Sequence, residues 1–220
     1  TLLESVCESC GLCVSMCPVG ALSDKSTRLK GKETRKVRTI CPFCGCGCSV
    51  YLSVWNQQVI GVTAAEEDSV NEVCLCVKGR YGFDFIHHPG RLTTPLVRRN
   101  GELCEASWDE ALDLVAAKLA GYRKDQVAVI SSAKCTNEDN YVIQKFARAV
   151  LGTNNVDHCA RLCHAPSVVG LVQSFGSGAM TNSINEIRDA ACILAIGTNT
   201  TAAHPIIGLE IRRAVRHGAK

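Results

Sequence analysis

Fifteen cysteines, most of them in short runs, constrain the fold of this 220-residue chain more than any other feature. The number is odd, and long helical and strand-like stretches can supply a hydrophobic core. A disulfide framework of the kind that holds small secreted domains is therefore not expected. Clustered cysteines in a chain of this kind more often bind metal. We expect the chain to fold around metal centres.

The first run, CESCGLCVSMCP at residues 7–18, has the spacing C-x2-C-x2-C-x3-C-P. Bacterial ferredoxins hold 4Fe–4S clusters with this spacing, whereas structural zinc sites usually place a dozen or more residues between two cysteine pairs. Gly11 is expected to relieve crowding where the backbone wraps the cluster. The fourth cysteine of such a run can instead serve another cluster, so its assignment stays open. The predicted ligands are Cys7, Cys10, Cys13 and Cys17.

A second group of cysteines follows a charged stretch at residues 23–38, which we interpret as a solvated linker with a domain boundary near residue 37. Residues 49–63 alternate in polarity and predict a hairpin that turns near Asn56. Such a hairpin would return the later cysteine pair to the earlier group. The residues alone leave six possible ligands for one site, namely Cys41, Cys44, Cys46, Cys48, Cys74 and Cys76.

The spacing C-x2-C-x3-C, followed about 27 residues later by a cysteine and x-K-G, resembles the N-terminal iron–sulfur domain of molybdopterin-dependent oxidoreductases. From the residues alone, Lys78 would be interpreted as a surface ammonium. The resemblance implies that Lys78 instead lies between the cluster and a pterin cofactor and carries the electronic connection. It leaves Cys46 and Cys74 as small fillers. The implied ligands of a second 4Fe–4S cluster are Cys41, Cys44, Cys48 and Cys76.

From residue 101 onward, alternating strand and helix patterns predict a parallel, doubly wound α/β sheet. Ser107 and Glu110 form a capping-box pattern at the start of a helix that Gly121 should end. Further helices are predicted at residues 137–152 and 204–218, the latter with Pro205 in its first turn. Buried strands are predicted at residues 126–131 and 191–196. Core positions are predicted for Cys104, Cys135, Cys159 and Cys192.

The loop GTNTTAAHP at residues 197–205 lies between a predicted strand and a predicted helix, where such folds bind phosphorylated ligands. The chain has no G-x-G-x-x-G motif, so a nicotinamide dinucleotide is not supported. In the family that the chain resembles, this loop contacts a pyranopterin guanine dinucleotide. Ala202 and Ala203 stand where relatives often have polar residues. The implied cofactor contacts are Gly197, Asn199, Thr200 and Thr201.

The motif DHCARLCHAP at residues 157–166 places Cys163 directly before His164. By itself the motif allows a buried filler, a nucleophile, a zinc ligand or a ligand to a catalytic metal. Residues 131–171 closely resemble molybdenum- or tungsten-dependent formate dehydrogenases, in which a cysteine or selenocysteine precedes a histidine. The resemblance implies that Cys163 ligates Mo or W, together with two pyranopterin guanine dinucleotides. His164 would orient the substrate or handle its proton.

The implied function is reversible oxidation of formate to CO2. Electrons would pass by Lys78 to the Cys41–Cys76 cluster, then to the Cys7–Cys17 cluster, and then to a partner redox subunit of ferredoxin, diaphorase or hydrogenase type. Two alternatives stay open. One is an iron–sulfur relay subunit with an empty pterin domain, and the other is a different molybdopterin oxidoreductase, such as a formylmethanofuran dehydrogenase-like enzyme.

Composition and chain length fit this organisation. The 24 basic and 21 acidic residues are too evenly balanced to suggest nucleic acid as a partner. No apolar run reaches the roughly 18–20 residues of a membrane span, and a cytoplasmic location is expected. The chain lacks an initiator Met, and we expect it to be part of a longer protein. The predicted domains are 1–36 (ferredoxin-like module and linker), 37–95 (second 4Fe–4S domain) and 96–220 (incomplete α/β pterin-binding domain).

Overall fold

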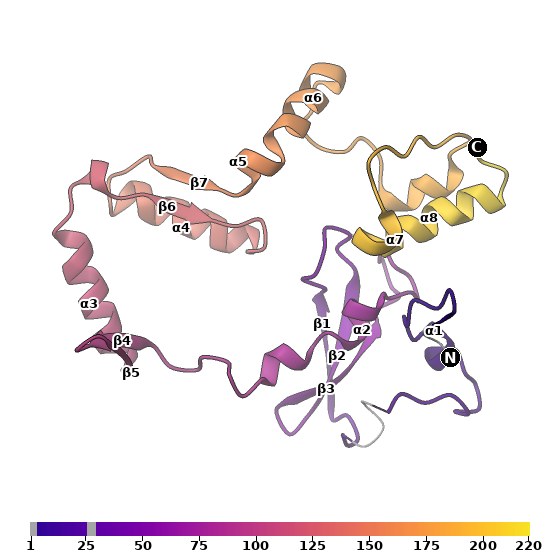
Figure 1. Ribbon diagram of the computed structural model, residues 1–220, viewed down its shortest axis with the longest axis horizontal. Helices are drawn as coiled ribbons and strands as arrows, with labels where there is room; N and C mark the ends of the chain where they lie inside the picture. The colour runs from indigo at the N-terminus through magenta and orange to yellow at the C-terminus, as the bar shows by residue number, and fades with distance from the viewer. Residues whose placement is uncertain (1–3, 26–29) are drawn as a thin grey trace. The chain divides into compact units, whose positions relative to one another are not determined.

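The computed structural model describes residues 4–25 and 30–220 and divides into two compact units (Figure 1). The first unit combines Thr1–Arg91 with the C-terminal segment Asn182–Lys220, and the second unit is Leu92–Thr181. The domain boundaries predicted after residues 36 and 95 stay predictions. The division into units follows packing, which joins the last 39 residues to the first part of the chain.

The first unit contains an antiparallel sheet in the order β1-β2-β3. The predicted hairpin is confirmed, because β2 (Ser49–Trp55) and β3 (Gln58–Ala64) pair across Asn56 and Gln57. Both turn residues have positive φ, 46° and 62°, as a two-residue type I′ turn requires.

Strand β1 (Arg35–Ile40) begins inside the stretch predicted as linker, so that prediction is wrong at its C-terminal end. All six residues of β1 are exposed, and six residue pairs join it to β2. Pairing with β2 stabilises β1, and neither face of β1 is buried. An alternating apolar pattern was therefore not needed, and no sign of a strand is visible in the sequence here.

The core of the first unit lies between the sheet, the cysteine loops and helix α8 (Pro205–Arg216). Val50 and Val62 of the sheet and Ile206 of α8 are buried in one cluster with Leu75 and Phe83. Burying an aliphatic side chain of this size contributes about 1.5–3 kcal/mol. The C-terminal helix is therefore an integral part of the unit that holds the cysteine runs.

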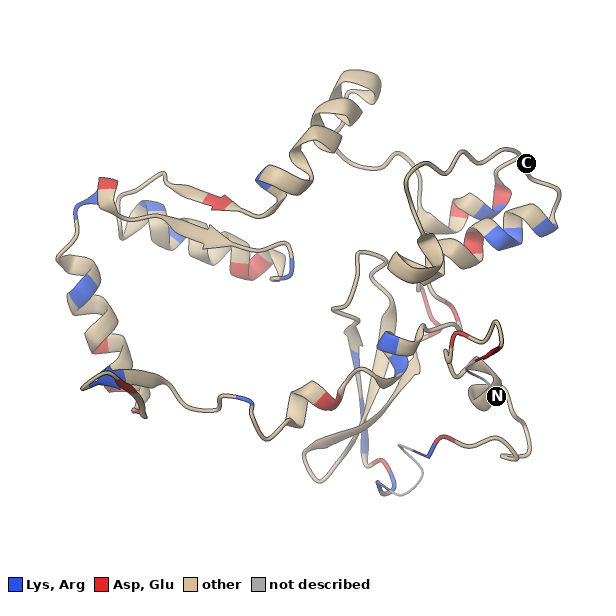
Figure 2. Ribbon diagram, in the orientation of Figure 1, with Lys and Arg blue, Asp and Glu red and all other residues tan. Residues whose placement is uncertain are grey.

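An ion-pair network attaches α8 to the loop before Cys74. Glu210 is 2% exposed and accepts hydrogen bonds from Arg188 Nε at 2.7 Å and Arg213 Nη1 at 2.8 Å. Glu72 accepts from the same two arginines, at 2.9 and 3.0 Å. The hydrogen bond from Arg188 lowers the pKa of the Glu72 carboxyl. Figure 2 shows acidic and basic positions interspersed along this C-terminal segment.

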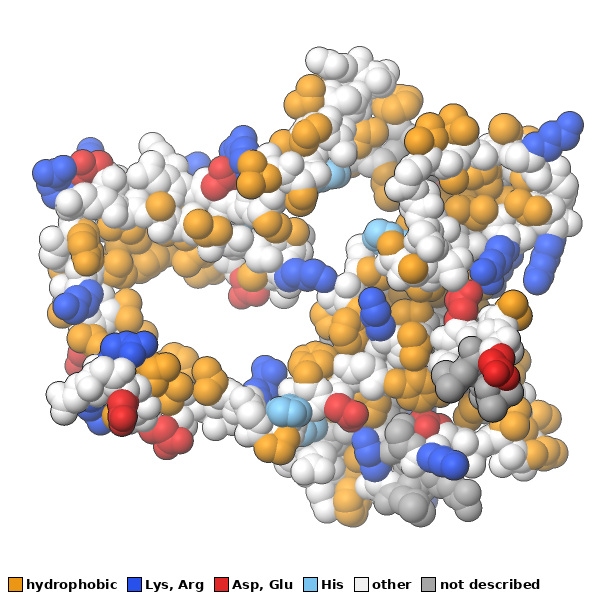
Figure 3. Space-filling view, in the orientation of Figure 1, with side chains coloured by type: hydrophobic (Ala, Val, Ile, Leu, Met, Phe, Trp, Pro, Cys, Tyr) orange, Lys and Arg blue, Asp and Glu red, His pale blue; other side chains and the backbone are white. Residues whose placement is uncertain are grey.

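The second unit is made of short strands and helices. A hairpin joins β4 (Leu96–Arg99) to β5 (Glu102–Glu105), and β6 (Val129–Ser131) pairs in parallel with β7 (Val156–His158). Only the last three residues of the strand predicted at 126–131 form β6, and Ile130 is 81% exposed rather than buried. Hydrophobic side chains reach the visible surface of this unit at several places (Figure 3).

The predicted helix ends are largely confirmed. Ser107 Oγ accepts from the Glu110 N–H at the start of α3 (Trp108–Ala120), and Gly121 follows its last residue. The carboxylate of Glu110 pairs with Arg99, so the capping box is not completed. Pro205 is the first residue of α8. The remaining helices are α1 (Leu12–Ser15), α2 (Val77–Tyr81), α4 (Asn137–Ala149), α5 (Ala160–Cys163), α6 (Ala165–Phe175) and α7 (Thr200–Ala203), with 3-10 turns η2 (Asp84–His87), η3 (Lys124–Gln126) and η4 (Ile184–Asp189).

Two predictions for the α/β part are wrong. Residues 191–196 form no strand. The Ile193 N–H donates to the Lys220 carbonyl, the Lys220 N–H donates to that of Ala191, and no strand among the described residues lies beside the segment to form a ladder. The expected core cysteines are also not buried: Cys104 is half-buried, and Cys135, Cys159 and Cys192 are exposed.

Candidate metal centres and cofactor site

The second cysteine group converges as the hairpin predicts. The Cys41 N–H donates to the Cys48 carbonyl at 2.9 Å and closes the first loop. Cys76 precedes α2, and its Sγ accepts from the Gly79 N–H at 3.4 Å. A Cβ added to Gly79 would lie 3.7 Å from Cys41 Sγ and 3.8 Å from Cys76 Sγ. The two loops therefore present their sulfurs to one place, with Cys44 packed against the same core.

Burial and the charges of neighbouring thiols raise the pKa of two buried cysteines of this group. Burial, followed by the charges of the neighbouring thiols at positions 46, 41, 44 and 76, raises the pKa of Cys48 to about 12. Burial, followed by the charge of Cys44, raises the pKa of Cys46 to about 11. Metals bind the thiolate, so a cationic centre must offset this cost. Several iron ions supply positive charge that offsets the cost of deprotonating these thiols. Buried thiols with raised pKa values therefore fit a multi-iron cluster.

No three His, Cys, Asp or Glu side chains in residues 4–25 and 30–220 form a group that could hold a single metal ion. The fit to a four-iron cluster therefore rests on the thiol set and its surroundings rather than on ligand distances. Cys46 and Cys74 are both buried within the same group. Their predicted role as fillers, and the choice of four ligands from six cysteines, stay predictions.

The first cysteine run lies around the short helix α1. Cys7 and Cys13 are exposed, and Cys10 and Cys17 are half-buried. Cys17 Sγ accepts from the Leu22 N–H at 3.5 Å, and this hydrogen bond, followed by those from residues 19, 21 and 20, lowers the pKa of Cys17. Backbone N–H groups directed at sulfur are among the features that tune iron–sulfur centres. The loop after Cys17 therefore favours the thiolate that a cluster needs.

Gly11 is required for a reason that the sequence did not indicate. Its φ of 73° lies in the left-handed region, and an added Cβ would overlap the Tyr81 hydroxyl and lie 2.5 Å from Arg80 Cδ. Two side chains of α2 therefore crowd this position. Close packing of the first cysteine loop on α2 needs a residue without a side chain at position 11.

Substituting Gly11 by alanine should lower the free energy of unfolding by more than the roughly 1–2 kcal/mol of a left-handed alanine, because the overlap with α2 adds to the strain. Gly20→Ala is the matched control, since Gly20 has φ 66° but nothing within 4 Å of its added Cβ. Denaturant titration and iron content should separate the two variants. Equal losses of stability and iron would contradict the packing argument.

A cavity of about 300 Å³ within the first unit connects three of the predicted elements. Cys44 and Cys76 line it beside Lys78, and Asn199 and Thr201 line it from the C-terminal segment. Cys10 of the first run also reaches it. The lining does not include Gly197 or Thr200, so the structure brings two of the four predicted loop contacts to the cavity.

Polar side chains of the cavity loop already have partners within the unit. Asn199 Oδ1 accepts from the Ala202 N–H at 3.2 Å and begins the short helix α7. Thr201 Oγ1 accepts from Arg212 Nη2 at 3.3 Å. The Thr200 hydroxyl lies near Gly208, 3.4 Å from where a Cβ would stand. These contacts fix the loop in one conformation before any ligand binds.

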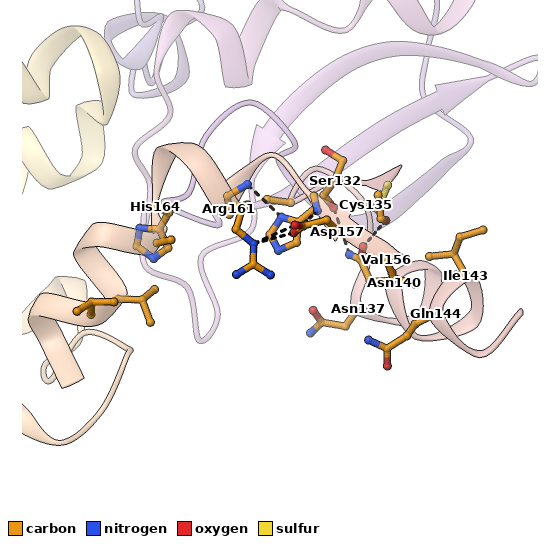
Figure 4. A pocket seen from close by; sticks show the side chains of 17 residues that line it. Ser132, Cys135, Asn137, Asn140, Ile143, Gln144, Val156, Asp157, Arg161 and His164 are labelled. Carbon is orange, nitrogen blue, oxygen red and sulfur yellow. Dashed lines mark hydrogen bonds and ion pairs between the residues drawn. The ribbon is translucent and has the colours of Figure 1, made fainter. Parts of the chain in front are cut away.

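Cys163 and His164 lie in the second unit, where α5 ends and α6 begins. Cys163 is exposed. His164 lines a cavity of about 860 Å³ with Asp157 and Arg161, but Cys163 is not part of this lining (Figure 4). Arg161 Nε lies 2.9 Å from Asp157 Oδ2, and this pairing lowers the pKa of Asp157. The motif thus lies at a helix junction beside a cavity that both polar and apolar side chains line.

Sequence reasoning missed Arg80. It follows Lys78 and Gly79 directly, so its place in the motif was visible, but the direction of its side chain was not. In the fold, Arg80 is buried and its Nε donates to the Cys10 carbonyl at 2.8 Å. This hydrogen bond joins residues 70 positions apart in the sequence, so no local sequence pattern indicates it.

Comparison with known proteins places the chain in a family. A model described as "Molybdopterin oxidoreductase" matches residues 91–220, which is more than half of the chain. Models for the molybdopterin oxidoreductase Fe4S4 domain and for a 4Fe-4S binding domain match residues 34–88 and 2–23. The chain belongs to the molybdopterin oxidoreductase family. The matches confirm the predicted fold class of two iron–sulfur modules and part of an α/β pterin-binding domain.

Within this family the chain is similar to formate dehydrogenase alpha subunits. It is 56% identical over 184 residues, 84% of its length, to the F420-dependent formate dehydrogenase 1 subunit alpha of Methanococcus maripaludis. It is 50% identical over 188 residues, 86% of its length, to the F420-dependent formate dehydrogenase subunit alpha of Methanocaldococcus jannaschii. The chain spans 27% and 28% of the length of these relatives. No helix among the described residues could cross a membrane.

Proposed function

We propose that this protein catalyses the reversible oxidation of formate to CO2 at a Mo or W centre held by two pyranopterin guanine dinucleotides. Electrons leave through two 4Fe–4S clusters to a partner subunit. The identity with formate dehydrogenase alpha subunits supports the substrate, together with the Cys163–His164 pair. Those relatives are named F420-dependent, which supports a partner that reacts with F420.

The observation that carries the proposal is the cavity shared by Lys78, the second cysteine group and the loop at residues 199–205. Lys78 lines it together with two predicted cluster ligands and two predicted cofactor contacts. A cationic side chain in that place suits an anionic dinucleotide, and Lys78 would link cluster and cofactor. One residue can therefore both hold the cofactor and conduct electrons from it.

The chain's residues have separate tasks in this proposal. Cys163 would hold the metal by its thiolate, since metal coordination deprotonates a thiol. The imidazole of His164 would orient formate or take its proton. When bound, the metal–pterin cofactor would supply the two-electron chemistry, while the protein supplies position and electrostatics. The cysteine loops would hold the iron–sulfur clusters that accept the electrons one at a time.

The test is reduction of the clusters by formate in the full-length enzyme. Elemental analysis should find Mo or W, and both cluster signals should appear in electron paramagnetic resonance after formate is added. Lys78→Met should slow cluster reduction by tenfold or more, on the order of the effect of losing a residue next to a metal centre, without loss of the metal.

Lys36→Met is the matched control, because Lys36 lies on β1, pairs with Glu33 at 3.3 Å and does not line the cavity. Its rate should equal that of the native enzyme. An unchanged rate in Lys78→Met would remove the bridging role. Iron without Mo or W would instead favour a relay subunit with an empty pterin domain.

A further inference from the structure

Arg80 joins the two cysteine groups by hydrogen bonds. Its backbone N–H donates to the Cys76 carbonyl at 3.0 Å, and its side-chain Nε–H donates to the Cys10 carbonyl at 2.8 Å. Cys76 is a predicted ligand of the second cluster, and Cys10 is a predicted ligand of the first. A single residue therefore connects the protein shells of both proposed clusters.

The guanidinium of Arg80 is buried without full compensation. The residue is 7% exposed, and its Nη2 is buried and has no hydrogen-bond partner among the described residues. An unpaired buried cation is costly, so an anionic group beside it would stabilise the fold. A four-iron cluster held by the four thiolates of the first cysteine run would carry net negative charge, and Arg80 Nε already donates to the Cys10 carbonyl of that run. The orphaned donor thus fits an iron–sulfur cluster there.

The Cys10 loop packs closely against α2. Gly11 leaves no room for a side chain beside Arg80 and Tyr81. Cys10 also lines a cavity of about 70 Å³ with Cys74 and Cys76, so the two cysteine groups are neighbours within one unit. The Arg80 guanidinium is therefore fixed beside the Cys10 loop and is not mobile in solvent.

We propose that Arg80 is a positioning residue that raises the reduction potential of the Cys7–Cys17 cluster and so directs electrons outward. In the step concerned, one electron leaves the Cys41–Cys76 cluster, which is oxidised, and enters the Cys7–Cys17 cluster, which is reduced. No bond breaks and no proton moves. The added negative charge is stabilised by the guanidinium. This inference rests on the proposed function, because it needs both clusters.

The experiment is a redox titration of the full-length holoenzyme, followed by electron paramagnetic resonance. Arg80→Gln should shift the one-electron equilibrium between the clusters about tenfold away from the first cluster, which corresponds to about 59 mV. Arg80→Lys keeps the charge and should stay close to the native value. Arg38→Gln is the matched control. Arg38 also donates to a backbone carbonyl, that of Glu67 at 2.7 Å, but it lies on the exposed strand β1, so its loss should leave the first cluster unchanged.

An unchanged potential in Arg80→Gln, with both clusters present, would overturn the inference. So would an equal shift in Arg80→Lys or in Arg38→Gln, because neither fits a local charge effect. Loss of the first cluster from both Arg80 variants would show a purely structural role and would also overturn it. A native enzyme without two cluster signals would overturn the proposed function itself.

Discussion

Replacing Cys163 by alanine should reduce formate oxidation by more than a hundredfold, while both cluster signals remain in electron paramagnetic resonance. Even residues outside the ligand shell of a metal typically cost 10–100-fold when they are removed, and a ligand should cost more. The clusters should persist because Cys163 belongs to the second unit, whereas the cysteines predicted to hold the clusters belong to the first.

Cys159→Ala is the matched control for this experiment. Cys159 lies four residues upstream, at the start of α5, and is also exposed. If Cys163 acts as the metal ligand, Cys159→Ala should keep formate activity and metal content near the native values. Retained activity in Cys163→Ala, or equal loss in both variants, would remove the ligand assignment.

Replacing Glu210 by alanine should lower the free energy of unfolding by about 3 kcal/mol, the low end of the range for breaking a buried ion pair. Glu210 accepts from Arg188 and Arg213, and among the described residues its loss leaves both cations with only the Glu72 carboxylate as a partner. Denaturant titration of the holoenzyme measures the change. Iron content should fall in parallel, because Glu72 lies just before the loop that carries Cys76.

Asp125→Asn serves as the control for the network, since Asp125 pairs with Arg123 in an exposed position. Exposed pairs contribute little, so no measurable loss of stability is expected there. A similar result for Glu210→Ala would show that the network does not secure α8.

Acid should weaken the network as well. The pKa of Glu72 is lowered, so its contribution is complete above the ordinary pKa of glutamate and is lost as pH falls through the folded-state value.

Local patterns were predicted well because their causes are local. The hairpin turn at Asn56, the Ser107 cap and the start of α8 at Pro205 depend on residues within a few positions of each other. The cysteine spacings indicated two metal-binding loops, and the hairpin brought the later pair back to the earlier group as expected.

Features that depend on distant partners were missed. Strand β1 exists through pairing with β2, and residues 191–196 stay irregular because no strand among the described residues lies beside them. The burial of Arg80 depends on the loop around Gly11, 69 positions earlier. Periodicity and spacing carry no information about such contacts, which only the assembled unit provides.

The place of α8 in the first unit also sets an order of events during synthesis. Ile206 and Ala214 are buried in a unit whose two cysteine clusters lie within the first 76 residues. A ribosome must therefore make the whole intervening segment before the iron-binding loops obtain their final hydrophobic cover. Cys76 is consequently synthesised 130 residues before Ile206, the residue of α8 that packs in the same buried cluster as the second cysteine group.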